Sequence, residues 1–227
     1  MSKNLFITGT GTDIGKTYIT GLIVKALHDM GKKAGYYKAA MSGNDRRADG
    51  SLIPGDALFV KECSGAAQPL EEMCPYIYEH AYSPHLASRL EGNPVTMEVV
   101  EEGFKKACKN HDYITMEGSG GILCPLEYSE KKIWLEDVIK QLNLPCIVIA
   151  DAGLGTINHV VLTVEYLRAR NIRVKGIIFN NCHPGSLLEE DNRVMCEERT
   201  GLKVLAQVCP GDLYLKMDND TLLSLYE

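Results

Sequence analysis

A glycine-rich turn near the start of the chain is the feature that most restricts its fold. The turn runs GTGTDIGKT from Gly9 to Thr17, between an apolar run at 3–8 and a helical pattern at 16–30. A strand, a glycine turn and a helix in this order can aim successive backbone N–H groups and a helix N-terminus at one anion. The turn therefore predicts a phosphate-binding loop (P-loop) in an α/β protein.

Two side chains of this turn have the chemistry that a nucleotide requires. Lys16 is expected to reach the β and γ phosphates, and the Thr17 hydroxyl to ligate Mg²⁺. The spacing is unusual, because five residues separate Gly9 from Gly15 where the common motif has four. An ordinary glycine turn with a surface lysine is the alternative, and the strand before the turn and the helix after it disfavour that alternative.

The remainder of the chain alternates short apolar runs with longer helical patterns. Strands are predicted at 34–38, 112–116, 146–150, 174–179 and 204–208, and helices at 97–109, 158–169 and 187–199. Nearly continuous Val, Ile and Leu in strands joined by helices indicates a mostly parallel β-sheet with helices on both faces. We expect a single α/β P-loop domain over residues 1–227, with the carboxyl ends of all strands at one ligand-binding edge.

Three charged residues are expected at that edge. Glu117 comes directly after the predicted strand at 112–116 and begins the segment EGSGG, where a magnesium ligand would lie. Asp56 opens a helix in PGDAL, and a helix N-cap is the alternative role for it. Lys38 ends the strand at 34–38, and a solvated surface side chain is the alternative there.

Composition excludes several classes of function. The formal net charge is −6, which gives no support for binding nucleic acid or an anionic membrane surface. The eight cysteines include no Cys-x-x-Cys pair, so we expect reduced thiols. The first apolar run is too short for a signal peptide and no run reaches membrane-span length, so we expect a cytoplasmic protein.

Several motifs together resemble one family. GTGTDIGKT, YYKAAMSG, PGDAL, SPH, MEGSGG and GTINH follow in the order and spacing of the dethiobiotin synthetase family, from residue 5 to at least 181. The resemblance implies ATP- and Mg²⁺-dependent joining of CO₂ to 7,8-diaminopelargonate. The product would be dethiobiotin, formed with ADP and phosphate through a phosphorylated carbamate in biotin biosynthesis.

The resemblance also assigns roles to individual residues. Lys38, Lys16 and Thr12 would be catalytic, and Thr17, Asp56 and Glu117 would bind the metal. The implied ATP contacts are Asp13, Ile14, Gly15, Lys16, Thr17, Tyr18, Asp56, Glu117, Gly118, Ser119, Gly120, Asn180, Asn181, Pro210 and Gly211. The implied contacts to the diamine or its carbamate are Thr12, Lys38, Ser42, Gly155, Thr156 and Asn158.

Members of this family are homodimers with active sites at the subunit interface. The resemblance implies that the loop 155–159 receives the substrate carboxylate from the neighbouring subunit. A helix N-terminus capped by Asn158 is the alternative interpretation, and it is compatible with the first because such ends attract anions.

Two other functions share this type of sheet. A ParA/MinD-like ATPase would act through protein partners, but that group typically carries an additional lysine early in the loop, where this chain has Gly9, Thr10 and Gly11. An amidotransferase of the cobyrinic acid amide synthase type would need an attached glutaminase domain, for which 227 residues leave no room. The stretch 211–227 does not follow the pattern of the dethiobiotin synthetase family.

Overall fold

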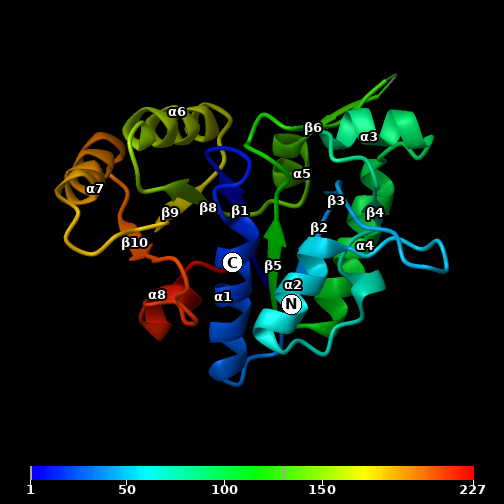
Figure 1. Cartoon of the computed structure of the whole chain (residues 1–227), viewed down its shortest axis with the longest axis horizontal. Helices are drawn as coiled ribbons and strands as arrows, with labels where there is room; N and C mark the ends of the chain where they lie inside the picture. The colour runs from blue at the N-terminus through cyan, green and yellow to red at the C-terminus, as the bar shows by residue number, and fades with distance from the viewer. Residues whose placement is uncertain (1, 130) are drawn as a thin grey trace.

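A six-stranded parallel sheet forms the centre of the computed structural model, which describes residues 2–129 and 131–227 (Figure 1). In spatial order the strands are β10 (Val204–Gln207), β9 (Val174–Asn180), β8 (Cys146–Asp151), β1 (Lys3–Gly9), β5 (Tyr113–Glu117) and β2 (Ala34–Lys38). Every neighbouring pair is parallel, so all six carboxyl ends meet at one edge. The predicted fold class is confirmed.

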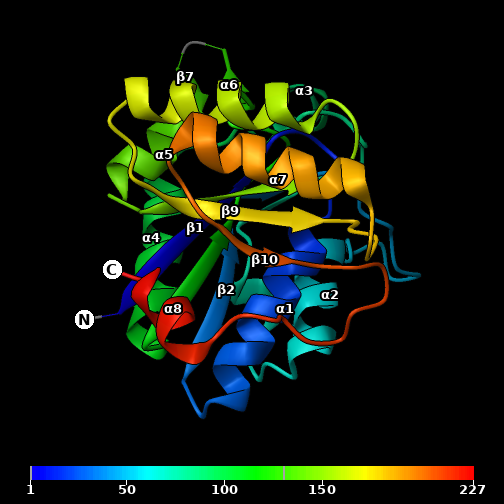
Figure 2. The ribbon, with the colours of Figure 1, turned by 90° about the vertical axis from the view of Figure 1, so that its left-hand side faces the viewer.

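Helices cover both faces of this sheet (Figure 2). One face carries α1 (Lys16–Asp29), α2 (Gly55–Ser64) and α8 (Asn219–Ser224). The other face carries α4 (Met97–Asn110), α5 (Leu135–Gln141), α6 (Thr156–Ala169) and α7 (Leu187–Thr200). Strand β8 shows why its sequence is apolar throughout. Alternate side chains point to opposite faces, so Cys146 and Val148 join one core and Ile147 and Ile149 the other.

Several short elements were not predicted. They are the strands β3 (Ala40–Met41), β4 (Tyr76–Ile77), β6 (Pro125–Tyr128) and β7 (Lys132–Trp134), the helices α3 (Pro84–Glu91), α5 and α8, and the 3₁₀ turn η1 (Leu70–Glu72). Strands of two to four residues are too short for a recognisable alternation. The segment 42–54 between β3 and α2 is mostly irregular, with an isolated bridge between Arg46 and Leu52.

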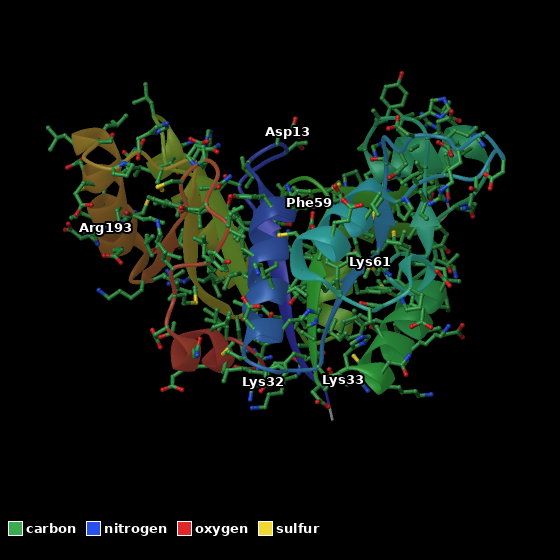
Figure 3. All side chains as sticks on the ribbon, turned by 60° about the horizontal axis from the view of Figure 1, so that its bottom comes forward. Asp13, Lys32, Lys33, Phe59, Lys61 and Arg193 are labelled. Atoms are coloured by element: carbon green, nitrogen blue, oxygen red, sulfur yellow. The ribbon has the colours of Figure 1, made fainter. Side chains whose placement is uncertain are left out.

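The two ends of the sheet differ in chemistry. Asp13 lies at the tip of the P-loop, whereas Lys32 and Lys33 lie at the opposite end of α1 (Figure 3). The residues predicted to bind ligands belong to the Asp13 end, because that is where the strands have their carboxyl termini. All eight cysteines of the sequence are free thiols, as expected.

Candidate active site

The P-loop backbone requires glycine at two positions. Gly15 has a φ of 89° and is the N-cap of α1, where no side chain caps the helix. A Cβ at Gly15 would lie 2.1 Å from Asn180 Nδ2, and one at Gly9 would lie 2.4 Å from Ile14 Cδ1. The glycines therefore let the loop fold tightly over the helix N-terminus, whose first N–H groups have no side-chain acceptor.

Lys16 is folded back into this loop. Its ammonium donates a hydrogen bond to the Gly11 carbonyl oxygen at 2.7 Å, and the residue is only 7% exposed. Burial, together with the nearby Lys38 ammonium, lowers the pKa of Lys16. A cation that is poorly solvated in this way gains more from an incoming phosphate than a surface lysine does.

Lys38 lies between two carboxylates. It ends β2 directly beside Glu117, which ends β5. The Lys38 ammonium lies 2.7 Å from Glu117 Oε1 and 2.5 Å from Asp56 Oδ2. Because Lys38 is only 5% exposed, the solvated-lysine interpretation is wrong.

Burial and ion pairing act in opposite directions on the pKa values of Lys38 and Asp56. Burial acts to lower the pKa of Lys38, but the carboxylates of Glu117 and Asp56 outweigh it and raise that pKa above its usual value. Burial likewise opposes ionisation of Asp56, yet the Lys38 ammonium holds the pKa of Asp56 below its usual value. Lysine and aspartate are therefore both ionised at neutral pH.

Asp56 is not a helix N-cap. Pro54 occupies the N-cap position of α2, and Asp56 is the second residue of the helix. The proline and glycine before it start the helix, which leaves the carboxylate free to face Lys38. The alternative role of Asp56 as the N-cap of a helix is therefore wrong.

The predicted magnesium ligands converge. Thr17 Oγ1 donates to Glu117 Oε1 at 2.8 Å, and Lys38 joins Glu117 to Asp56. Among the described residues no group of three or more His, Cys, Asp or Glu side chains forms a metal cage. Mg²⁺ is commonly held by one or two carboxylates together with waters and nucleotide phosphates, so a hydroxyl and two carboxylates fit that ion.

A cavity of about 400 Å³ opens over these charges. Its wall includes Thr12, Asp13, Gly15, Lys16, Thr17, Lys38, Ser42, Asp56, Glu117, Ser119 and Gly120. The structure thus brings most of the predicted phosphate, metal and diamine contacts to one space. Gly118 lies behind the wall, since its N–H donates to the Ile7 carbonyl and a Cβ there would meet Leu135 and Phe6.

The loop at the start of α6 borders a second cavity of about 340 Å³. Thr156 lines this cavity, and Thr12 lines both cavities, so the two spaces adjoin at the P-loop. The helix begins at Thr156 with Gly155 as its N-cap, at a φ of 92°. Asn158 is therefore inside the first turn, and its predicted role as the helix cap is wrong.

Asn180 ends β9 and Asn181 follows it, and both side chains hold neighbouring loops. Asn180 Nδ2 donates to the Ile14 carbonyl at 3.0 Å, while its buried Oδ1 has no hydrogen-bond partner. Asn181 Nδ2 donates to Asp151 Oδ2 at 2.7 Å. One amide oxygen, on Asn180, is thus left without a donor beside the P-loop.

Beyond these asparagines lies a cavity of about 570 Å³ between the turns that follow β9 and β10. Cys182, His183 and Cys209 contribute to its wall. Pro210 and Gly211 come next and are exposed. Tyr18 does not face the phosphate cavity, because its hydroxyl donates to the Asp212 carbonyl oxygen and ties α1 to the last loop.

One buried contact at the site was not predicted from the sequence. The Tyr36 hydroxyl donates to Glu117 Oε2 at 3.0 Å, and Tyr36 is fully buried. The available signal was its position two residues before Lys38 on the same strand, which places both side chains on one face of the sheet.

Comparison with known proteins agrees with this geometry. The family model described as AAA domain matches residues 3–213. An ATP-dependent dethiobiotin synthetase BioD of Brachyspira hyodysenteriae is 48% identical over 228 aligned residues, covering 100% of both chains. The protein of the same name from Clostridium perfringens is 48% identical over 92% of this chain and 91% of its own. This chain belongs to the ATP-dependent dethiobiotin synthetase family.

The fold is more widely shared than the family. The MinC:MinD cell division complex of Aquifex aeolicus contains a chain that superposes with a TM-score of 0.55 at 14% identity, covering 92% of this chain and 81% of that one. At an identity this low, the superposition shows a common fold and carries no information about the function of this chain. Across residues 2–129 and 131–227, no helix has the length and apolar character needed to cross a membrane.

Proposed function

We propose that this member of the dethiobiotin synthetase family closes a cyclic urea on 7,8-diaminopelargonate, using CO₂ and ATP, within one domain that spans residues 1–227. The observation that carries the proposal is the cavity that joins two buried ammonium groups, Lys16 and Lys38, to the Thr17 hydroxyl and two carboxylates. The similarity to dethiobiotin synthetases supports this class of reaction, and the geometry of the cavity supports it through the positive charge that two reacting anions require.

The reaction has three steps. One amine adds to CO₂ and loses a proton, giving a carbamate. The carbamate oxygen attacks the γ-phosphorus of ATP, and ADP leaves. The second amine then attacks the carbamate carbon, closing the five-membered urea as phosphate departs and the amine loses its proton.

Two anions, the carbamate and the γ-phosphate, must approach each other in this scheme. Lys16 would contact the phosphates and Lys38 the carbamate and the transferred phosphoryl group, since both ammonium groups line one cavity. Thr12 and Ser42, in the same wall, would position the diamine. Catalysis would depend on alignment and charge stabilisation more than on proton transfer.

Thr17, Asp56 and Glu117 would hold Mg²⁺, which when bound neutralises phosphate charge and acts as a Lewis acid. The N–H groups of Gly15 to Tyr18 would bind the phosphates. Asn180, Asn181, Pro210 and Gly211 would border the base, and the unpaired Asn180 Oδ1 suits an exocyclic amine such as that of adenine.

We further propose a homodimer in which the α6 N-terminus of one subunit receives the substrate carboxylate of the other through Gly155, Thr156 and Asn158. Exposed leucines just before and within α6 support a docking face: Leu154 is 89% exposed and Leu162 63%. Leu154→Glu is expected to give monomers in analytical ultracentrifugation and to raise the KM for the diamine. A dimer that persists with unchanged KM would remove this face from the proposal.

The reaction is tested by phosphate release from MgATP with and without diaminopelargonate and bicarbonate, with mass spectrometry for dethiobiotin. We expect release that depends on the diamine and yields dethiobiotin. Slow release that ignores the diamine and gives no product would contradict the ligase. Such a result would favour an ATPase that acts through protein partners.

A further inference from the structure

Glu117 is held from two sides. Its Oε1 atom accepts from Thr17 Oγ1 and Lys38 Nζ, both in the wall of the phosphate cavity. Within the described part of the chain, its Oε2 atom accepts from Tyr36 alone, on the side away from that wall. Glu117 is 1% exposed and Tyr36 is fully buried, so no bulk water competes for this bond.

The backbone of Tyr36 is fixed as well. Strand β2 is the last in the sheet, so its outer edge lacks a strand partner. The Gln68 side chain replaces one, accepting from the Tyr36 N–H at 2.9 Å and donating to the Tyr36 carbonyl at 3.0 Å. Gln68 is itself 3% exposed. A tyrosine anchored through its backbone and buried around its ring can hold its hydroxyl at one position.

We infer that Tyr36 is a positioning residue, which orients Glu117 so that Oε1 faces the Mg²⁺-nucleotide. This inference rests on the proposed function, because it takes Glu117 as a metal ligand. A carboxylate with one oxygen fixed cannot rotate freely about its terminal bond, and its second oxygen then keeps a constant direction. Outer hydrogen bonds of this kind commonly determine how well a ligand carboxylate binds its metal.

Tyr37 provides a matched control on the same strand. It is 1% exposed, and its hydroxyl also makes one buried hydrogen bond, to the Val100 carbonyl oxygen at 2.8 Å. Since neighbouring side chains of a strand point to opposite faces, this bond lies away from Glu117. Tyr36→Phe and Tyr37→Phe therefore each remove one buried hydroxyl, and only the first changes the surroundings of Glu117.

The experiment measures binding of ADP by titration calorimetry, once with excess MgCl₂ and once with EDTA. Tyr36→Phe is expected to weaken MgADP binding about tenfold, as for other outer-sphere losses, and to leave metal-free ADP binding unchanged. Tyr37→Phe is expected to leave both affinities unchanged, although both variants melt at a lower temperature. If Tyr36→Phe does not fold, Gln68→Leu replaces it, with a smaller loss of MgADP affinity expected.

Glu117→Gln separates failure of the inference from failure of the proposed function. We expect this variant to lose most of the advantage that Mg²⁺ gives to ADP binding. If it does so while Tyr36→Phe binds MgADP like the wild type, the inference is wrong and the metal site stands. If Glu117→Gln also keeps the full advantage, the proposed metal site itself is wrong.

Discussion

The two halves of the ligand-binding edge are built differently. At the ends of β1, β5 and β2, charged side chains bond to one another at distances of 2.5 and 2.7 Å, the Thr17 hydroxyl joins them at 2.8 Å, and the group is mostly buried. At the ends of β9 and β10, neutral amides hold the loops, and the last turn is exposed at Pro210 and Gly211. The first half holds its chemical groups in place before a ligand arrives, whereas the second offers a space bordered by turns.

This difference shows where precision is required. Phosphoryl transfer depends on charges held within fractions of an ångström, so their supports are buried and bonded. A base is bound by contact and a few hydrogen bonds, which flexible turns can supply. Substitutions in the charged half should therefore cost far more activity than those at the ends of β9 and β10, the half that we propose to bind the base (the base half).

The largest effect is expected for Lys38→Met. Removing an ammonium that stabilises transferring charge should lower kcat by about 10²–10³-fold, measured by dethiobiotin formation. Because it leaves Glu117 buried without its cation, the nucleotide-free protein should lose about 3–5 kcal/mol of unfolding free energy. Normal turnover in this variant would remove Lys38 from the chemistry.

Gly15→Ala should rank next. The added Cβ would meet the Asn180 amide at 2.1 Å, and alanine is strained at a φ of 89°. We expect nucleotide binding to weaken by at least tenfold, since the loop must shift by a distance that misaligns its N–H groups. Gly31→Ala is the control, because that glycine also has a positive φ but no neighbour near its Cβ, and it should bind nucleotide normally.

Asn180→Ala connects the two halves, because its amide supports the P-loop from the base side. Losing one buried hydrogen bond costs about 1 kcal/mol, which corresponds to a severalfold rise in the KM for ATP. The preference for ATP over GTP should fall at the same time. A rise in KM with the same preference would limit Asn180 to supporting the loop.

Pro210→Ala should have the smallest effect, less than about twofold in the KM for ATP, because the residue is exposed and changing a surface side chain seldom alters the structure. In steady-state kinetics the loss of activity should then decrease in the order Lys38→Met, Gly15→Ala, Asn180→Ala and Pro210→Ala. If Pro210→Ala lowered activity as much as Lys38→Met, the proposed difference between the two halves of the edge would be wrong.

The charged half was also the half that the sequence predicted well. Lys38 and Glu117 end parallel strands, and Lys16 and Thr17 begin the helix that the glycine turn joins to β1, so parallel topology brings all four to one edge. The role of Asp56 was left open, because its distance from Lys38 depends on how α2 packs. The base half lies in turns, and no pattern in residues 211–227 indicated that Tyr18 would bond to the Asp212 carbonyl.

Tyr36 could not be assigned in advance for a related reason. In the sequence it is one aromatic residue of two in a buried strand, and Tyr36 and Tyr37 differ only in which face of the sheet they point to. The direction of that alternation becomes known when β2 is paired with β5 in register. The two-residue spacing from Lys38 gives Tyr36 the same face as the lysine, but its hydrogen bond to a residue 81 positions away depends on that register.

The side-chain amide of Gln68 has an effect beyond the active site. An edge strand with free N–H and C=O groups is a template on which strands of other molecules can add, and this is a common start of aggregation. On β2, Gln68 occupies both backbone groups of Tyr36, and the Lys38 N–H donates to the Met73 carbonyl at 2.8 Å. These three backbone groups at the carboxyl end of β2 are thereby unavailable to a strand of another molecule.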